Sequence, residues 1–191
     1  YNCWHCSETG SIKFEENNFR LIRRENVVHA VDNNRWRDLT TENGSITYLN
    51  SRGISEQTAK NVGLKFKHHY IASEKKEMPC IVFPYISNEK TEFAKIRSFP
   101  DKGFSSQGSA VNFFNIDNVN DNEFMIICEG EMDCLSFIEV GYKSVVSIPH
   151  GAVMKVIDGK IDAKEDGKFK FIWNAKKKLD ECEKIVIAMD S

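Results

Sequence analysis

The sequence predicts a mixed α/β protein whose second half folds as a parallel sheet with flanking helices. In that half, apolar segments of strand length at 123–129, 143–149 and 184–190 alternate with helical segments at 133–141 and 176–183. Runs of β-branched residues that alternate with helices are typical of parallel sheets buried on both faces. Active groups in such sheets gather at the carboxyl ends of the strands.

Composition places the chain among ordinary globular proteins. It has 191 residues, 41% of them hydrophobic and 28% charged, which suits one large domain or two small ones. The apolar runs are of strand length, so no membrane partner is expected. A net charge of −2 argues against a wholly basic nucleic-acid coat but leaves room for local basic patches. The six cysteines do not form a disulfide framework, and a reducing compartment is expected.

The first segment, "YNCWHCSETG", offers two thiols with the spacing of half a zinc ribbon, Cys3 and Cys6, followed by a glycine. A complete structural zinc site needs four ligands, so we expect the other pair upstream of Tyr1. The alternative is two unpaired thiols in a loop. We assign residues 1–16 to the end of a ribbon and 17–39 to a linker. The arginines of that linker are interpreted as a solvated face in preference to a nucleic-acid contact.

Residues 40–118 are expected to form a small α+β subdomain. Ser55 is placed to cap a helix that Gly63 ends. The β-rich "CIVFPYI" carries Pro84, which suggests an edge strand or a bulge. In "FAKIRSF", the period of two puts Lys95 and Arg97 on one face, and Lys102 follows on the next loop. A solvated strand whose basic residues guard an edge is the alternative interpretation of these cations.

Residues 119–191 are expected to form the parallel-sheet subdomain, which carries a cluster of acids. Glu129, Glu131 and Asp133 leave the end of one strand in "ICEGEMDCL", and Asp190 leaves the end of the last strand. Convergent carboxylates suit Mg²⁺, and Gly130 is expected to let the backbone turn tightly between the glutamates. The alternative is structural, because acids at the start of a helix cap free amides and meet the helix dipole.

Taken in order, these motifs resemble a known family. "ICEGEMD", "SIPHGA" and "IVIAMD", each after a strand, are similar to the TOPRIM fold shared by primases and topoisomerases. With the cysteine pair, "YLNSRGISEQTAKNVGL", "IVFPY" and "KIRSFPDKGF" upstream, the chain resembles the primase half of phage primase-helicases and their Twinkle-type organellar relatives. The resemblance covers most of the chain, from Cys3 to Asp190. It also implies that the second half is a TOPRIM subdomain truncated at its C-terminus.

The resemblance implies roles for individual residues. Glu129 and Asp133 match the two acids of a metal-linked catalytic motif. Asp190 matches the first acid of a DxD-like motif, whose second acid is expected after Ser191. Lys95 and Lys102, with Arg97 beside them, match basic residues that hold nucleotide and primer phosphates. Cys3 and Cys6 would bind Zn²⁺ in the complete ribbon.

The implied function is that of a DNA primase, a template-directed RNA polymerase that starts chains on single-stranded DNA. Two Mg²⁺ or Mn²⁺ ions, ribonucleoside triphosphates, a fused or associated ring helicase and a DNA polymerase are the implied partners. The expected location is the cytoplasm of an infected bacterial host, or a mitochondrion or plastid for an organellar relative. A TOPRIM nuclease that cleaves DNA and a catalytically silent DNA-binding module are the alternatives. We expect the sequence to be part of a larger protein.

Overall fold

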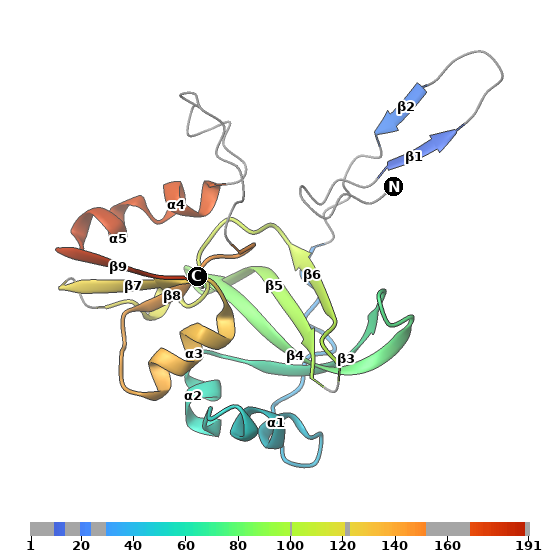
Figure 1. The fold of residues 1–191 in the computed structure, drawn as a ribbon, viewed down its shortest axis with the longest axis horizontal. Helices are drawn as coiled ribbons and strands as arrows, with labels where there is room; N and C mark the ends of the chain where they lie inside the picture. Colours follow the sequence, from blue (N-terminus) through green and yellow to red (C-terminus); the bar gives the residue numbers. More distant parts are fainter. Residues whose placement is uncertain are drawn as a thin grey trace.

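Two larger sheets, one antiparallel and one parallel, organise the chain (Figure 1). The computed structural model describes residues 10–13, 20–23, 30–99, 101–120, 123–151 and 169–189. Strand order is β3-β4-β5-β6 in the antiparallel sheet and β8-β7-β9 in the parallel sheet. A third, two-stranded antiparallel ladder joins β1 (Gly10–Lys13) to β2 (Arg20–Arg23). The expected mixed class and the expected parallel sheet are both confirmed.

The antiparallel sheet is a meander of consecutive strands. These are β3 (Lys65–Ile71), β4 (Lys76–Ser87), β5 (Lys90–Ser98) and β6 (Phe104–Gly108). A two-residue turn joins β4 to β5, and both of its residues, Asn88 and Glu89, adopt positive φ. This is the conformation that tight hairpin turns require, and asparagine tolerates it better than most residues.

Pro84 lies in β4, an inner strand of the antiparallel sheet. β4 pairs with β3 from Lys76 to Val82 and with β5 from Cys80 to Ser87. At Pro84, β4 therefore has a neighbour on one side alone, which accommodates a residue without an N–H. The register shifts between Tyr85 and Ile86, so the expected bulge is present next to the proline. The expected edge position applies at Pro84 itself, although β4 lies between β3 and β5 in the order of strands.

Helices pack against both faces of the central strand of the parallel sheet. Its strands are β7 (Phe124–Cys128), β8 (Val145–Ser147) and β9 (Lys184–Ala188), and its helices are α3 (Glu131–Glu139), α4 (Lys170–Asn174) and α5 (Lys176–Glu181). Alternate residues of β7 belong to two different hydrophobic clusters, one on each face of the sheet. Met125 and Ile127 pack with α4 and α5, whereas Ile126 and Cys128 pack with α3. The helix expected at 133–141 begins two residues earlier, at Glu131.

The main core lies between the two sheets and three helices. It joins α1 (Ser45–Ser51), α2 (Glu56–Asn61) and α3 to β4 and β7. Cys128 and Cys134 are fully buried there. Their thiols donate to the backbone carbonyls of Val146 and Val145 in β8, at 3.2 and 3.5 Å. Burial raises the pKa of Cys134 well above its usual value, so this thiol is a protonated packing group.

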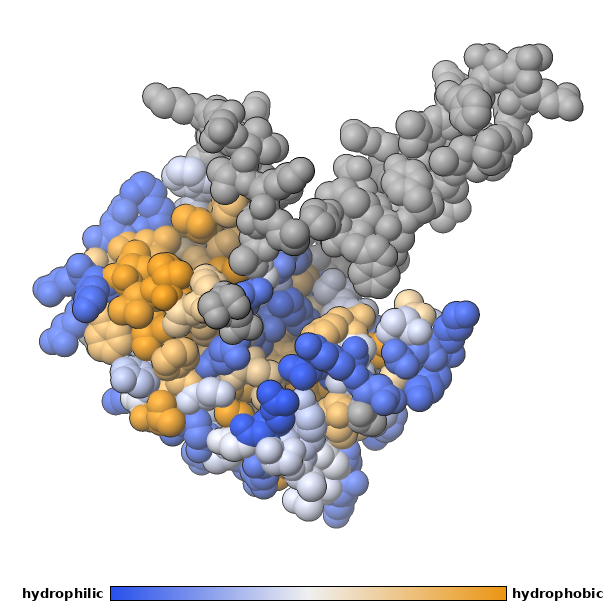
Figure 2. Space-filling model, viewed as in Figure 1, coloured by the Kyte–Doolittle hydropathy of each residue, from blue (hydrophilic) through white to orange (hydrophobic). Residues whose placement is uncertain are grey.

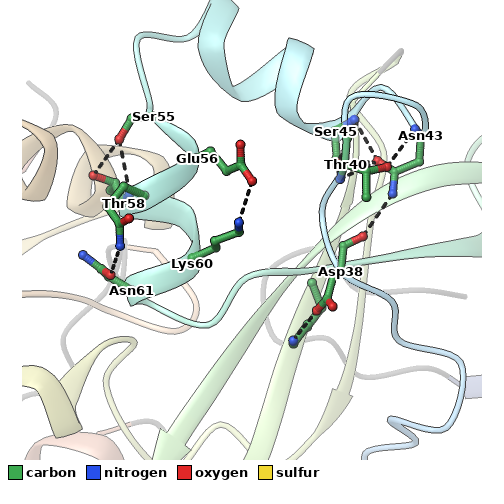
Figure 3. A network of polar contacts seen from close by, with 11 residues as sticks. Asp38, Thr40, Asn43, Ser45, Ser55, Glu56, Thr58, Lys60 and Asn61 are labelled. Carbon is green, nitrogen blue, oxygen red and sulfur yellow. Dashed lines mark hydrogen bonds and ion pairs between the residues drawn. The ribbon is translucent and has the colours of Figure 1, made fainter.

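Ser55 caps α2, as the sequence predicts. Its hydroxyl oxygen accepts the N–H of Thr58 at 3.2 Å, and Gly63 follows the helix with φ of 74° (Figure 3). The Ser55 backbone N–H and hydroxyl also donate to the carboxylate of Glu139, both at 2.9 Å. The cap therefore ties α2 to the last residue of α3, which starts beside the acidic cluster.

Part of the segment expected as linker packs onto the antiparallel sheet. Leu39 is 4% exposed in the main core, and Arg37 exchanges two backbone hydrogen bonds of 2.8 Å with Phe66 in β3. Trp36 packs against the outer face of the same sheet. Within the described residues, packing onto the sheet thus begins before residue 40.

Hydrophobic side chains also gather on the surface of the parallel-sheet half (Figure 2). Ile185 is 41% exposed and Ile187 is 62% exposed on β9, an edge strand of the described sheet. No helix in the described part of the chain is long and apolar enough to cross a membrane.

Removal of the Leu135 side chain should loosen α3 from the sheet. Leu135 is completely buried in the main core, so Leu135→Ala should lower the free energy of unfolding by about 2–5 kcal/mol. Val140, next to the same helix, is 72% exposed, and Val140→Ala should change that free energy by less than about 0.5 kcal/mol. Urea unfolding followed by circular dichroism measures both. Equal effects of the two changes would contradict this description of the core.

Candidate active site

Three carboxylates follow strand β7, and their side chains have different surroundings. Glu129 follows the strand, Gly130 is the residue before α3, and Glu131 and Asp133 lie in the first turn of that helix. Glu129 is partly buried, Asp133 is exposed, and Glu131 is only 8% exposed. The acidic cluster is therefore not a single group of equivalent ligands.

The carboxylate oxygens of Glu129 are not used by any other residue that the structure describes. The side chain makes no hydrogen bond or ion pair with any residue in the described ranges. The loop after β8 approaches it closely, because a Cβ added to Gly151 would lie 3.4 Å from one carboxylate oxygen of Glu129. Gly151 has φ of 72°, a conformation that favours glycine. The expected meeting of these two strand ends is confirmed.

Asp133 is partly engaged in the helix start. Its carboxylate accepts the N–H of Gly130 at 3.1 Å, as an acid in the first turn of a helix commonly does. A Cβ on Gly130 would lie 2.8 Å from the same oxygen. Gly130 itself is extended, with φ of −117°. The backbone bends at Glu129 and Gly130 as expected, but the bend needs no left-handed conformation. The glycine is favoured because it makes room for the Asp133 carboxylate.

Glu131 points into the protein and is neutralised there. The ammonium of Lys95 lies 2.7 Å from its carboxylate, and the hydroxyl of Tyr85 donates a hydrogen bond to the same oxygen. The side chain of Lys95 is 22% exposed and that of Glu131 is 11% exposed. Burial, and then the negative charge of Glu131, raise the pKa of Tyr85 well above its usual value, so the phenol stays a donor.

This contact was missed by the sequence reasoning, which gave Glu131 no separate role. A tyrosine inside the apolar run "CIVFPYI" was the available signal, because a buried phenol needs a hydrogen-bond partner. Its partner comes from another segment, which no periodicity in β4 could identify.

Basic residues form the opposite wall of the site. Lys95 and Arg97 lie on one face of β5, as expected, and pair across the strands with Ser106 and Phe104 of β6. Lys102 lies in the loop between these strands. Ser98 holds the loop, since it exchanges backbone and side-chain hydrogen bonds with Gly103 at 2.8–3.3 Å. Arg52, which follows α1, also lines the site and was not predicted.

One groove of about 800 Å³ brings the two walls together. Five of the predicted site residues line it: Glu129, Asp133, Lys95, Arg97 and Lys102. Asp190, Cys3 and Cys6 lie outside the described residues, so their predicted ligand roles stay predictions. Within the described ranges, no three His, Cys, Asp or Glu side chains form a group that could hold a metal ion.

His150 also lines the groove. Its ring lies edge-on to Phe93, with centroids 5.6 Å apart. Loss of surrounding water, and then the charge of Lys95, lower the pKa of His150 below its usual value. The imidazole is therefore neutral at pH 7 and adds no charge to the basic wall.

Comparison with known proteins identifies the relatives of this chain. No family model matches the sequence. The chain is 31% identical over 144 residues to the chloroplastic/mitochondrial Twinkle homolog protein of Arabidopsis thaliana, which covers 75% of this chain and 20% of that protein. It is 32% identical over 111 residues to the Primase homolog protein of the same plant, which covers 58% of this chain and 33% of that protein. The chain thus spans only a minor part of either relative.

Solved structures place the fold. The primase fragment of the bacteriophage T7 primase-helicase superposes with a TM-score of 0.56 at 22% identity, covering 88% of this chain and 64% of that one. The chain is therefore a relative of the Twinkle and primase homologues, and it has the fold of the primase half of a phage-type primase-helicase.

Proposed function

We propose that the groove is the active site of a DNA primase, which makes short RNA primers on single-stranded DNA. The observation that carries the proposal is the meeting of Glu129 and Asp133 with Lys95, Arg97 and Lys102 on the walls of one groove. An acidic wall opposite a basic wall suits a reaction in which a phosphate ester is made and a polyanion leaves. The relationship to the plant Primase homolog protein supports the same conclusion.

The proposed reaction joins two nucleotides. The 3′-hydroxyl oxygen of one attacks the α-phosphorus of the next, and the bond from that phosphorus to the bridging oxygen of the β-phosphate breaks. The hydroxyl proton is lost and pyrophosphate leaves with the electron pair of the broken bond. Catalysis of this kind depends on positioning and on charge stabilisation.

The basic wall would hold the triphosphate. An ammonium has three donors, and the contact with Glu131 uses one of those on Lys95. The others remain for phosphate oxygens, and Glu131 fixes the direction of the side chain. Arg97 adds a planar guanidinium, which suits phosphate better than a point charge does. Lys102 is exposed in its loop and extends the positive surface along the groove.

The acidic wall fits a divalent cation. Glu129 has no partner among the described residues, the open space beside Gly151 adjoins its oxygen, and Asp133 has a second oxygen besides the one that accepts the Gly130 N–H. Divalent cations bound here would lower the pKa of the attacking 3′-hydroxyl and neutralise charge on the phosphates. We propose Glu129, Asp133 and Asp190 as ligands of Mg²⁺ or Mn²⁺. The TOPRIM assignment, and zinc at Cys3 and Cys6, belong to the same proposal.

An organellar location accompanies this proposal. The relative that aligns with most of this chain is called chloroplastic/mitochondrial, which favours a mitochondrion or plastid over a phage-infected cell. We further propose that a ring helicase acts with this chain on the same single-stranded DNA, as the sequence resemblance implies.

Loss of the Glu129 charge should abolish primer synthesis. In the presence of Mg²⁺, single-stranded DNA and labelled ribonucleotides, Glu129→Gln should lower the rate of RNA formation by roughly 100-fold or more, because charge stabilisation at the phosphoryl centre is lost. Glu77→Gln removes an exposed carboxylate that does not line the groove and should leave the rate unchanged. DNA cleavage by the wild type in place of RNA synthesis would instead favour a nuclease. DNA binding with neither product would favour a silent module.

Lys95 should have separable structural and functional roles. Lys95→Met leaves Glu131 charged and partly buried, and should lower the free energy of unfolding by about 3 kcal/mol. The double change Lys95→Met with Glu131→Gln removes that unpaired charge and should restore most of the stability. It should still raise the KM for ribonucleotides roughly 10-fold or more, because charged hydrogen bonds to phosphate are lost. Urea unfolding and steady-state kinetics measure the two effects, and a stable double variant with an unchanged KM would refute the phosphate-binding role.

A further inference from the structure

Phe104 presents an aromatic ring to the groove. It is the first residue of β6, directly opposite Arg97 of β5, so it lies on the same face as the basic wall. The side chain lines the groove together with the acids of the first turn of α3. Phe104 thus faces the place where the proposed function puts nucleotides.

The exposure of this ring is not explained by packing. Phe104 is 54% exposed and is absent from the three clusters that form the core of the described chain. Phe93 lines the same groove but is 2% exposed, because it packs against Tyr85 and His150. Exposure of a phenylalanine in a groove leaves apolar area in water, which costs free energy unless a ligand covers it.

Arg97 supports the ring from one side. Its guanidinium carbon lies 5.6 Å from the centroid of Phe104, which is the range of a cation–π contact. The Nε atom of Arg97 is buried and has no hydrogen-bond partner among the residues that the structure describes. The guanidinium thus lies beside the ring in the groove lining, and no residue in the described ranges is recorded as an acceptor for its donors.

We infer that Phe104 is a stacking platform for a nucleobase, backed by the Arg97 guanidinium. This inference rests on the proposed function and adds a binding residue to it. A phenyl ring has no donor or acceptor, so it would contact the face of a base and accept any of the four. Stacking of this kind is how proteins hold single strands without reading their sequence. The base belongs either to the DNA strand or to a ribonucleotide, which the experiment distinguishes.

Binding of single-stranded DNA tests the platform without any need for catalysis. A short DNA oligonucleotide that contains 2-aminopurine reports stacking by its fluorescence. Phe104→Ala should weaken its binding roughly 5- to 100-fold, the range found for loss of one stacked base. Phe104→Trp should keep the affinity. Tyr70 on β3 is also 54% exposed but does not line the groove, and Tyr70→Ala is the matched control that should bind like the wild type.

An abasic oligonucleotide separates stacking from charge. With no base to stack, the wild type and Phe104→Ala should bind it equally well, because the phosphates still meet the basic wall. A second titration compares the binding of ribonucleoside triphosphates to the wild type and to Phe104→Ala by calorimetry. A loss of affinity in Phe104→Ala that is confined to this second titration would assign the stacked base to the ribonucleotide. Unchanged binding of both DNA and ribonucleotides by Phe104→Ala would overturn the inference.

The two proposals fail in different ways. If the wild type makes no RNA but its DNA binding depends on Phe104, the primase proposal fails and the platform stands. If RNA is made and Phe104→Ala binds both ligands normally, the platform is wrong and the primase proposal stands.

Discussion

The ion pair between Glu131 and Lys95 is the contact on which the geometry of the site depends. It joins the start of α3, and so the parallel sheet, to β5 of the antiparallel sheet, while the Tyr85 hydroxyl completes it from β4. Because the pair is largely withdrawn from water, neither partner can leave without a large penalty. Together with the main core, this neutralised pair therefore holds the acidic side of the groove against the basic side.

This contact also explains why one acid of the cluster differs from its neighbours. Glu129 and Asp133 face the groove, and Glu131 between them supports the basic wall. A helix that starts immediately after a strand turns successive side chains in different directions, so a run of acids is divided between surface and interior. The local sequence "EGEMD" thus contributes both to the chemistry of the groove and to its framework.

The sequence predicted the parts of this arrangement that follow from local geometry. The period of two placed Lys95 and Arg97 on one face, and the strand-end rule placed Glu129 beside Gly151. The direction of Glu131 could not be predicted, because Tyr85 lies 46 residues away in the chain and on the other sheet. The exposure of Phe104 could not be predicted either, because it depends on which residues of distant segments pack beside the ring. The reason for a glycine at position 130 was likewise not predictable, because the space it leaves is filled by the side chain of Asp133.

Burial of the Cys134 thiol behind the acidic wall bears on how this part of the protein meets oxidants. The thiolate is the reactive form of cysteine, and burial raises the pKa of Cys134, so this residue stays protonated. Cys182 is only half-buried. Oxidative stress in the compartment would therefore reach Cys182 before the thiols that pack the start of α3. The packing behind the groove is thus shielded from the oxidant that an outer cysteine would meet first.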